Sequence, residues 1–596
     1  GGNGDGAGAG DGGAGDEPVK LLPAGALSRA RLALRELWTP DRRVGQRWTL
    51  AYLAGQDQFV SYDGRRYRTV RDVAVQSVIL QLFEGYRVLT AEGIQRLGHV
   101  DPDAPETCRG VERDDTKRAA LSASQVREVM DALKSEVAVH EDALPVWSAA
   151  TFDEKGRSVY GVGAWPDFSE SAPVRMPVAY RNGLLDMDRF IRGSVVMLPH
   201  TPRFVSTACI PYELPVEEIR RELARDPDGV DDGGDILARL APRTAAALGE
   251  VCDGDTVKLR ALQQCCGLVQ TFDVSFEVAF LLVGPPASFK GTWCELLTAV
   301  VGMDNTAYTS LVEVTERFET ANLVGKPLAI IDEAHVGHRT DAVEAVRRLK
   351  TMISAMPVSA DVKFGEKRSF VRPQCRFVIT ANELPKLPDA SAAMVRRLVV
   401  IPFTRSFAAK MDRTLKRDVI AEAAGVAAWG LFGYRSLLRT GSFVLPQDGA
   451  DMLEDFRRLS SQVFAFLSDC CVVEPLEGGV GDVRCKALYA LYRAWAEAGG
   501  LSVLSEERFG SQLKAAVPGL RRITRKVAHM GRWMAYEGVR PRLAGEPAGE
   551  KGYRRVEHIY DLGGIADDFG FEVERATVGG GGGGDAWWNR DGGVPT

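Results

Sequence analysis

The first half of the chain alternates between helical spacing and short extended runs. Apolar residues recur at helical spacing in three segments that we expect to be helices: Arg29–Trp38, Val70–Gln95 and Ser122–His140. From Ser158 to Leu214 the pattern changes to short alternating runs separated by glycine and proline, including VAYRNGLLDMDRF and VVMLPHTPRFVST, which predict strands and hairpins. Helical spacing returns from Glu217 to Leu240, around a turn-rich DPDGVDDGGD, and again from Ala241 to Val269.

An alternation of strands and helices follows. The apolar run VAFLLVG (Val278–Gly284) predicts a buried strand, and a glycine- and proline-containing turn, a helix, a strand, a helix and a strand come after it. This order is typical of a largely parallel sheet flanked by helices, so we expect an α/β fold. After Phe407 the chain is helical to Cys471, and Val483–Tyr536 then predicts two helices and a basic strand pair, as in a winged-helix module.

The composition is that of a globular protein. Of 596 residues, 45% are hydrophobic and 26% charged, which excludes a wholly disordered, collagenous or coiled-coil chain. The 74 basic and 80 acidic side chains leave a net charge of −6, so any contact with nucleic acid must be local. Glycine makes up nine of the first sixteen residues and all of Gly579–Gly584, which predicts disordered ends.

Cysteine usage and hydropathy bear on the cellular location and on membrane association. The ten cysteines include no C-x-x-C, which argues against a disulfide scaffold and a zinc ribbon. No apolar stretch approaches the roughly 20 residues of a membrane span, and no secretory signal opens the chain. We therefore expect no membrane partner and a reducing, cytoplasmic location in a bacterial or phage-infected bacterial cell.

The segment LLVGPPASFKGTWCELL (Leu281–Leu297) predicts a strand, a turn and a helix that begins near Lys290. Such a turn can wrap a polyphosphate with backbone N–H groups while the lysine reaches the β and γ phosphates. Compared with G-x-x-x-x-G-K-[ST], Phe289 replaces the second glycine and Gly291 the Ser/Thr, with Thr292 one step later. Because a bulky residue restricts the loop torsions, an ordinary strand–turn–helix corner stays an alternative. The candidate nucleotide-binding residues are Gly284, Pro285, Pro286, Ala287, Ser288, Phe289, Lys290, Gly291 and Thr292.

A second apolar strand, within LVGKPLAIIDEAHVG, ends in Asp332 and Glu333. Beside a phosphate loop, the aspartate can hold Mg²⁺ and the glutamate can polarise the attacking water. Alone, such a pair is more often a solvated strand end. His335 and His338 follow at metal-like spacing, but without a third or fourth ligand we expect them to be exposed loop histidines.

A third strand, CRFVITANELP, places Asn382 at its C-terminal tip, the edge where open parallel sheets bind their ligands. An amide there can bridge the γ-phosphate and the attacking water. Arg396 and Arg397 then lead into another strand, and an arginine offered to a neighbouring subunit's nucleotide would stabilise the transferred phosphoryl group. The candidate catalytic residues are Lys290, Asp332, Glu333, Asn382, Arg396 and Arg397.

Two basic clusters are candidates for DNA contacts. Between the second and third strands, VSADVKFGEKRSFVRPQ predicts a hairpin with Lys363, Lys367 and Arg368 at its tip, placed to meet the phosphates of a threaded strand. The second cluster, RRITRKVAHMGRW, lies in the predicted wing and contributes Arg521, Arg522, Arg525 and Lys526. For the first cluster the alternative is a solvated turn, and the second could hold a duplex or a partner protein.

The order of these motifs resembles that of superfamily 3 helicases, specifically the phage/plasmid and poxvirus-type primase–helicase group. Further likeness lies in the run from VAYRNGLLDMDRF to LPHTPRFVSTACIPYEL, in LVVIPFTRSF, and in ALYALYRAWAEAGGLSVLSEERFGSQL near the end. The resemblance implies an AAA+-like P-loop NTPase that translocates 3′ to 5′ on single-stranded DNA as a hexameric ring during phage or plasmid replication. The implied partners are single-stranded DNA, replication forks, other copies of the chain, and a primase, polymerase or single-strand-binding protein.

The resemblance also implies cofactors and roles. ATP and Mg²⁺ would bind at Lys290 and Thr292, with Asp332 holding the metal. Glu333 would activate water, Asn382 would sense the γ-phosphate, and Arg396 or Arg397 would act across the subunit boundary. Lys363 and Lys367 would contact DNA.

Together these patterns divide the chain into segments. We expect a disordered linker over 1–22, an N-terminal α+β domain of primase–helicase type over 23–215, a helical collar over 216–275, the ATPase over 276–410, a helical segment over 411–475, a winged-helix domain over 476–545 and a mostly disordered tail over 546–596. An upstream primase domain is common in the family. The pair Asp186-x-Asp188 has no convincing partners for a two-metal polymerase centre, so we interpret it as structural.

Two other functions remain open from the residues. GPP followed by KGT also suggests a nucleotide kinase, although no acceptor pocket or arginine-rich lid is evident. Alternatively, Phe289 marks a decayed loop, and the chain is a non-catalytic DNA-binding scaffold of a replication complex.

Overall fold

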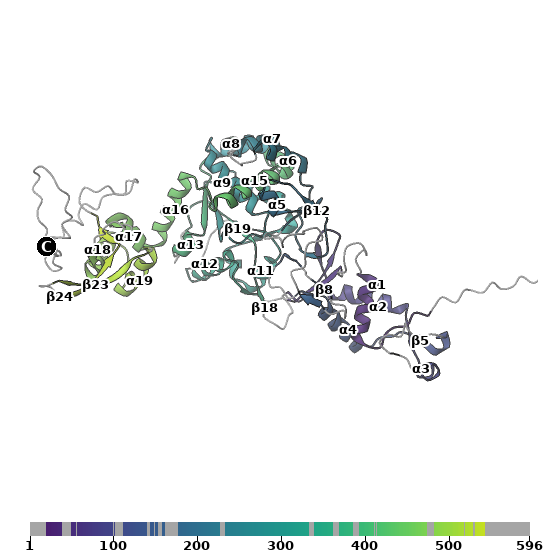
Figure 1. The fold of residues 1–596 in the computed structure, drawn as a ribbon. Helices are drawn as coiled ribbons and strands as arrows, with labels where there is room; N and C mark the ends of the chain where they lie inside the picture. Colours follow the sequence, from purple (N-terminus) through teal and green to yellow (C-terminus); the bar gives the residue numbers. More distant parts are fainter. Residues whose placement is uncertain are drawn as a thin grey trace, which may run out of the picture.

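The computed structural model of the chain describes residues 19–38, 49–54, 56–98, 101, 111–139, 144–147, 150–152, 158–160, 177–226, 233–332, 339–360, 369–385, 392–410, 412, 414–473, 482–517, 519–527 and 531–542. Figure 1 shows an elongated arrangement in which an N-terminal unit (purple) and a C-terminal unit (yellow-green) lie at opposite ends of a larger central unit. Within these ranges, none of the helices combines the length and the apolar composition that a bilayer crossing needs.

The N-terminal unit is a small sheet covered by helices. Its elements are α1 (Ala26–Leu37), β1 (Leu50–Leu53), β2 (Gln58–Tyr62), β3 (Tyr67–Val70), α2 (Asp72–Glu84), β4 (Arg87–Leu89), α3 (Ala91–Leu97), β5 (Thr116–Arg118), α4 (Ala123–Glu136) and β6 (Ala138–Val139). Four strands lie in the order β3-β2-β1-β6, and apolar side chains of α1, α2 and α4 pack with them in one core. The helix predicted over 70–95 ends at Glu84, because the chain then forms β4, which pairs with β5.

The linker predicted over 1–22 does not extend as far as Leu22. Leu21 and Leu22 are buried, with 7% and 4% exposed, and Leu21 forms a bridge with Arg87. Their apolar side chains have a core to enter, and this stabilises the segment although the sequence before it is rich in glycine. Residues 1–18 and the predicted tail over 546–596 lie outside the described residues.

Short strands connect this unit to the central one. They are β7 (Val146–Trp147), β8 (Ala150–Phe152), β9 (Ser158–Tyr160), β10 (Val178–Tyr180), β11 (Gly183–Leu185), β12 (Met197–Leu198) and β13 (Phe204–Val205), with helix α5 (Met187–Ile191) after β11. The predicted hairpin is present, since β10 and β11 pair antiparallel with Tyr180 opposite Gly183. Asp186 is buried and its side chain accepts a hydrogen bond from the Arg189 N–H at 3.0 Å as the N-cap of α5, which is a structural role.

Helices form the upper layer of the central unit in Figure 1: α6 (Val216–Arg225), α7 (Gly234–Leu240), α8 (Pro242–Cys252), α9 (Thr256–Leu268), α14 (Leu415–Ala421) and α15 (Ala423–Thr440). The backbones of α9 and α15 approach so closely that glycine is required where they meet. A Cβ on Gly267 would lie 2.0 Å from the Gly430 carbonyl oxygen, and one on Gly430 would lie 2.7 Å from Cys266 Sγ. Tight packing of two apolar helices therefore depends on these small residues.

The central sheet has five parallel strands in the order β15-β16-β19-β14-β20. The strands are β14 (Ala279–Val283), β15 (Thr306–Thr309), β16 (Leu328–Ile331), β19 (Arg376–Ala381) and β20 (Leu398–Pro402). The helices around them are α10 (Lys290–Val301), α11 (Arg317–Asn322), α12 (Arg339–Ile353) and α13 (Ala392–Val395), with short 3₁₀ turns η3 (Met303–Asn305), η4 (Glu313–Thr315) and η5 (Ala408–Lys410). A further 3₁₀ turn, η2 (Arg113–Asp115), precedes β5 in the N-terminal unit. A separate antiparallel hairpin pairs β17 (Val358–Ala360) with β18 (Ser369–Val371). The predicted parallel sheet is thus present.

Alternate residues of the sheet enter two different cores. Phe280 and Leu282 of β14 pack with α9, α10 and α15, whereas Leu281 and Val283 pack with α12 and with α16 (Gln447–Ser460). Because both faces are covered, β14, β16 and β20 are continuously apolar rather than alternating. This explains why the strand runs stand out in the sequence.

The C-terminal unit has its own aromatic core. Its elements are α17 (Gln462–Cys470), β21 (Cys471–Val473), β22 (Asp482–Arg484), α18 (Cys485–Ala498), α19 (Glu506–Ala516), β23 (Arg521–Val527), β24 (Gly531–Glu537) and β25 (Val539–Pro541). Three strands pair in the order β22-β24-β23, and β21 pairs with β25. Phe466 of α17 lies 5.6–6.0 Å, ring centre to ring centre, from Tyr492, Trp495 and Phe509, which fastens α17 to α18 and α19.

Packing divides the chain differently from the sequence patterns. The helical segment predicted over 411–475 contains α14 to α17, and these helices join different cores. Helix α15 packs with α9, α16 packs on the sheet, and α17 belongs to the C-terminal core. Likewise β10, β11 and α5, predicted within the N-terminal domain, share the core of the collar helices. The boundaries of the units therefore follow from which apolar side chains pack together and not from the positions of the turns.

The glycine contact between α9 and α15 yields a stability prediction. We expect Gly430→Ala to lower the free energy of unfolding by about 1–3 kcal/mol, because its methyl group would overlap Cys266. Gly249→Ala is the matched control: it lies in helix α8 with nothing within 4 Å of the added Cβ, and should raise stability by about 0.5–1 kcal/mol. Urea unfolding followed by tryptophan fluorescence measures both, and equal effects would contradict the close approach.

Candidate functional site

The loop over 284–289 joins β14 to α10 and is pinned at its start. Gly284 donates a hydrogen bond to the Ala381 carbonyl at 3.2 Å, and a Cβ on Gly284 would lie 2.0 Å from the Phe403 carbonyl oxygen. Further along the loop, Ser406 Oγ donates to the Pro286 carbonyl at 3.1 Å and Phe407 N donates to the Ala287 carbonyl at 2.8 Å. The segment after β20 therefore supports the loop, a role that sequence reasoning did not assign.

Two residues of the loop have left-handed backbone conformations. Ala287 has φ of 57° and Phe289 has φ of 78°. Phe289 occupies the place of the second glycine in the motif, and it adopts the backbone region that glycine favours. Its ring packs against the core of the central unit, which compensates for the strain. Phe289 thus combines a backbone conformation that favours glycine with an aromatic ring placed against the core.

Lys290 is the first residue of α10 and its side chain turns back into the loop. The ammonium Nζ donates to the Gly284 carbonyl at 2.5 Å, to the Pro285 carbonyl at 2.9 Å and to Ser288 Oγ at 3.2 Å. It also lies 3.3 Å from Asn382 Oδ1, on the tip of β19. Lys290 is only 8% exposed, so the loop holds a desolvated cation that an anion could satisfy better than neutral oxygen atoms do.

Asp332 follows β16 and lies beside β19. The register pairs Ile331 with Ile379, and Thr380 Oγ1 donates a hydrogen bond to Asp332 Oδ1 at 2.6 Å. Burial, and secondarily the Asp332 carboxylate, raises the pKa of the Cys294 thiol on α10 to about 12. Asp332 therefore faces the first turns of α10 as well as β19. Sequence reasoning missed Thr380, although its position two residues before Asn382 is readable once the register is known.

The structure thus brings Lys290, Asp332 and Asn382 to one edge of the sheet, because β19 lies between β14 and β16. Thr292 lies half-buried in the first turn of α10, and Gly291 is exposed. The oxygen donors of Asp332 and Thr292 are of the kind that Mg²⁺ prefers, so the residues present fit that ion. In the described parts of the chain no group of three or more His, Cys, Asp or Glu side chains forms a metal site. Glu333, His335 and His338 lie outside the described residues.

Arg396 and Arg397 do not join this group. Arg397 precedes β20, and its backbone carbonyl accepts from Ala279 N at the first residue of β14, which is the opposite edge of the sheet. Its guanidinium pairs with Glu277 at 2.9 Å and bonds Ser354 Oγ at 2.8 Å, whereas Arg396 is exposed. Within one chain, a strand of about 16 Å separates these arginines from the loop over 284–289.

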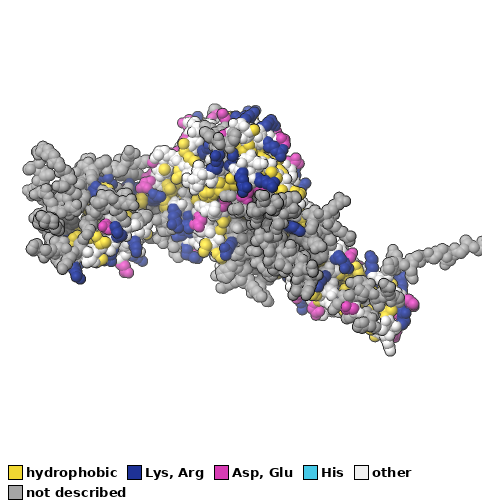
Figure 2. Space-filling model, viewed as in Figure 1, with side chains coloured by type: hydrophobic (Ala, Val, Ile, Leu, Met, Phe, Trp, Pro, Cys, Tyr) yellow, Lys and Arg dark blue, Asp and Glu magenta, His cyan; other side chains and the backbone are white. Residues whose placement is uncertain are grey.

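The candidate DNA contacts are only partly described. Lys363, Lys367 and Arg368 lie outside the described residues, although the flanking β17 and β18 form the predicted hairpin. Arg521 pairs across the strands with Glu537 at 2.9 Å. Arg522 is exposed, and Arg525 and Lys526 occupy positions in β23. On the face in Figure 2, basic and acidic side chains lie interspersed over the central unit, in keeping with the nearly balanced charge.

Comparison with known proteins matches this part of the chain to a family. Residues 282–397 match the family described as "Family of unknown function (DUF5906)", a segment that runs from β14 to Arg397 and includes Lys290, Asp332 and Asn382. No curated protein matches the chain.

Solved structures of the NrS-1 C-terminal region are similar at a low level. The A-form apo structure of that region has 12% identity and a TM-score of 0.39, over 82% of this chain and 95% of that chain. The apo structure of NrS-1 residues 305–718 has 12% identity and a TM-score of 0.37, over 87% of this chain and all of that chain. At this level the likeness does not identify an activity.

The strain at Phe289 can be measured separately from the loss of its ring. Phe289→Gly and Phe289→Ala both remove the ring, but only glycine adopts a φ of 78° without a Cβ penalty. We expect the glycine variant to be more stable than the alanine variant by about 1–2 kcal/mol in chemical unfolding. An alanine variant of equal or greater stability would mean that the loop is not held in this conformation.

Proposed function

We propose that the chain is an ATP-hydrolysing DNA helicase of the superfamily 3 type, acting in phage or plasmid replication. The observation that carries the proposal is the 3.3 Å contact between Lys290 Nζ and Asn382 Oδ1, with Asp332 on the neighbouring strand tip. An ammonium, an amide and a carboxylate at adjacent strand ends can bind, sense and position a triphosphate. The parallel five-stranded sheet and the order of the motifs along the chain support the same proposal.

Each residue has a distinct role in the proposal. Lys290 leaves the loop carbonyls and binds the β and γ phosphates of ATP. Thr292 and Asp332 hold Mg²⁺, which supplies positive charge at the phosphates. Thr380 keeps the Asp332 carboxylate oriented, because its hydroxyl donates to one carboxylate oxygen and leaves the other available. Asn382 contacts the γ-phosphate, and Glu333 accepts a proton from the attacking water.

The proposed arginine comes from another copy of the chain in a hexameric ring. Neither arginine reaches Lys290 within one chain, and this favours action in trans. Arg396 is the better candidate, since it is exposed, whereas Arg397 is engaged with Glu277 and Ser354. Removing Arg397 would break a contact inside the subunit as well as any contact between subunits.

The C-terminal unit supports a winged-helix module. The order α17, β22, α18, α19, β23, β24, with β22 pairing to β24, has two helices followed by a basic strand pair. Within it, Arg522, Arg525 and Lys526 are the proposed DNA contacts. Arg521 contributes less charge, because Glu537 neutralises it. Lys363, Lys367 and Arg368 remain proposed contacts of the central hairpin.

A non-catalytic scaffold is the second candidate, and one observation favours it. The Lys290 ammonium already has oxygen partners inside the loop, and Phe289 crowds the same turn. A protein that no longer binds nucleotide would keep such contacts permanently. The scaffold and the helicase differ in whether ATP is hydrolysed.

Replacing Lys290 separates the two functions. We expect Lys290→Ala to reduce ATP hydrolysis stimulated by single-stranded DNA about a hundredfold or more, because it removes a preorganised cation from the transferred phosphate. Lys117→Ala, an exposed lysine of β5 in the N-terminal unit, is the control and should retain full activity. Undiminished turnover in the Lys290 variant would exclude both a helicase and a nucleotide kinase. If the wild-type protein does not hydrolyse ATP, the non-catalytic scaffold is the function that remains.

The orientation of Asp332 can be tested through its metal requirement. Thr380→Val removes the hydroxyl donor while preserving shape, so we expect the Mg²⁺ concentration for half-maximal ATP hydrolysis to rise about tenfold. Thr380→Ser keeps the hydroxyl and should restore the wild-type requirement. An unchanged Mg²⁺ requirement in the valine variant would show that Asp332 is not a metal ligand positioned by Thr380.

A further inference from the structure

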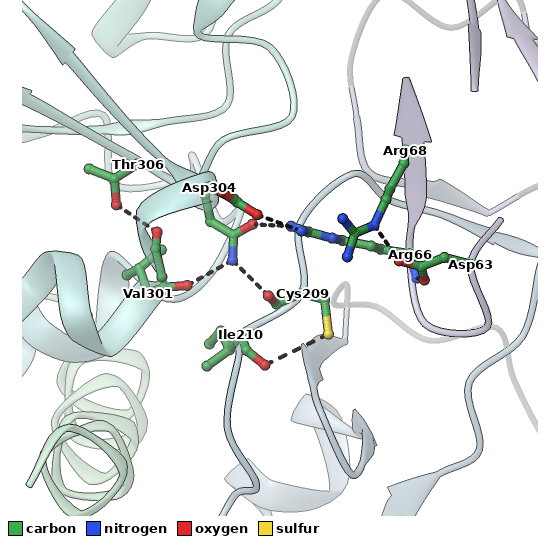
Figure 3. A network of polar contacts seen from close by, with 10 residues as sticks. Asp63, Arg66, Arg68, Cys209, Ile210, Val301, Asp304 and Thr306 are labelled. Atoms are coloured by element: carbon green, nitrogen blue, oxygen red, sulfur yellow. Dashed lines mark hydrogen bonds and ion pairs between the residues drawn. The ribbon is translucent and has the colours of Figure 1, made fainter. Parts of the chain in front are cut away.

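The helix that begins with Lys290 ends against the N-terminal unit. α10 runs to Val301 and is followed directly by η3. Arg66 lies in the loop between β2 and β3, and its Nη2 is 2.6 Å from Asp304 Oδ2 (Figure 3). Its Nη1 donates a hydrogen bond to Asn305 Oδ1 at 3.3 Å. The Arg66 side chain is only 13% exposed although its partner Asp304 is 72% exposed. Arg66, although far away in sequence, thus bonds to the turn η3 that follows α10.

The β2–β3 loop is built to present Arg66. Asp63 Oδ1 accepts hydrogen bonds from the backbone N–H groups of Arg65 and Arg66, each at 3.0 Å. Asp63 Oδ2 accepts from Arg68 Nε at 2.6 Å. Because one carboxylate bonds two residues of the loop and Arg68 of β3, Arg66 is held in place before it meets η3. Little conformational entropy is then lost when the contact forms.

On the other side of the contact, Asn305 joins Arg66 to the helix. Its side chain is buried, and Nδ2 donates to the Val301 carbonyl at 2.7 Å and to the Cys209 carbonyl at 2.9 Å. The amide oxygen and the amide nitrogen of Asn305 are therefore both used, and Arg66, α10 and the segment after β13 all bond to this side chain. The hydrogen bond from Arg66 also lowers the pKa of Asp304 below its usual value.

These contacts place the N-terminal unit one helix length from the phosphate loop. α10 has 12 residues, so about 18 Å separate its ends. A packed helix moves as a rigid body, and Lys290 must change partners if a triphosphate binds. A displacement of the first residue of α10 would then also move Asp304 and Asn305, which follow its last residue.

We propose that the contact of Arg66 with Asp304 and Asn305 couples the nucleotide state of the phosphate loop to the N-terminal unit. The proposal rests on the proposed function, since it requires that the loop bind a nucleotide. By reciprocity, a ligand that binds the N-terminal unit and shifts the β2–β3 hairpin changes the nucleotide affinity of the loop. The device needs no contact between the nucleotide and the N-terminal unit.

Hydrogen–deuterium exchange of the full chain, with and without AMP-PNP and Mg²⁺, tests the coupling. In the wild type, we expect the nucleotide to slow amide exchange over residues 58–70 about fivefold, the lower range of measured couplings. Arg66→Ala should still bind the nucleotide but lose this effect. Asp304→Asn, at an exposed position that tolerates change, should weaken it. Arg65→Ala, the exposed neighbour in the same loop, is the matched control and should keep it.

The possible results separate the two proposals. If AMP-PNP binds the wild type and protects the phosphate loop but leaves residues 58–70 unchanged, the coupling is wrong and the proposed function stands. If Arg66→Ala and Asp304→Asn both keep the wild-type response, the Arg66 contact does not transmit it. If AMP-PNP does not bind, the proposed function fails and the coupling fails with it.

Discussion

The candidate site depends on the parallel register that sets β19 between β14 and β16. This order makes the carboxyl ends of three buried strands neighbours, so that an ammonium, a carboxylate and an amide from distant parts of the sequence meet at one edge. Both faces of the sheet are covered by apolar helices, which excludes water from the strands and prevents the register from slipping. If the register shifted by one residue, Thr380 would no longer face Asp332 and the amide of Asn382 would move away from Lys290.

Helix α10 extends this arrangement through the central unit. Its first residue, Lys290, follows the loop over 284–289 and bonds back to it. Its last turn is bound at the Val301 carbonyl by the Asn305 amide and at the Val300 carbonyl by the hydroxyl of Tyr212. The same element therefore belongs to the site and to the boundary with the N-terminal unit. A single packed helix with both ends held thus links the loop over 284–289 to the boundary with the N-terminal unit.

Much of the central unit could be predicted from the sequence because its physical signals are local. Continuously apolar runs such as VAFLLVG mark strands buried on both faces. Asp332 and Asn382 directly follow their strands, and Lys290 follows β14 after the loop over 284–289. Their meeting at one edge followed from the rule that parallel strands share their carboxyl ends. The hairpin of β10 and β11 was predicted for the same reason, since its turn carries Asn182 and Gly183 between apolar residues.

What could not be predicted depends on long-range packing. Thr380 faces Asp332 only because of the strand register, and Arg397 is engaged with Glu277 only because the first residues of β14 and β20 are neighbours. Two further features also depend on the tertiary fold. Leu21 and Leu22 are buried although they follow a glycine-rich stretch, and α17 packs in the C-terminal core. The roles of Glu333 and of the hairpin tip at Lys363 stay predictions, because these residues lie outside the described ones.

The most direct measurement of the central claim is an electron cryo-microscopy structure of the wild-type chain with AMP-PNP, Mg²⁺ and single-stranded DNA. The account predicts density for a triphosphate at the loop over 284–289, with Lys290 Nζ withdrawn from the Gly284 and Pro285 carbonyls and bound to phosphate oxygens. Asp332 and Asn382 should flank the same density, and an arginine of another copy should approach it. A saturating nucleotide bound elsewhere, with Lys290 still on those carbonyls, would contradict the account.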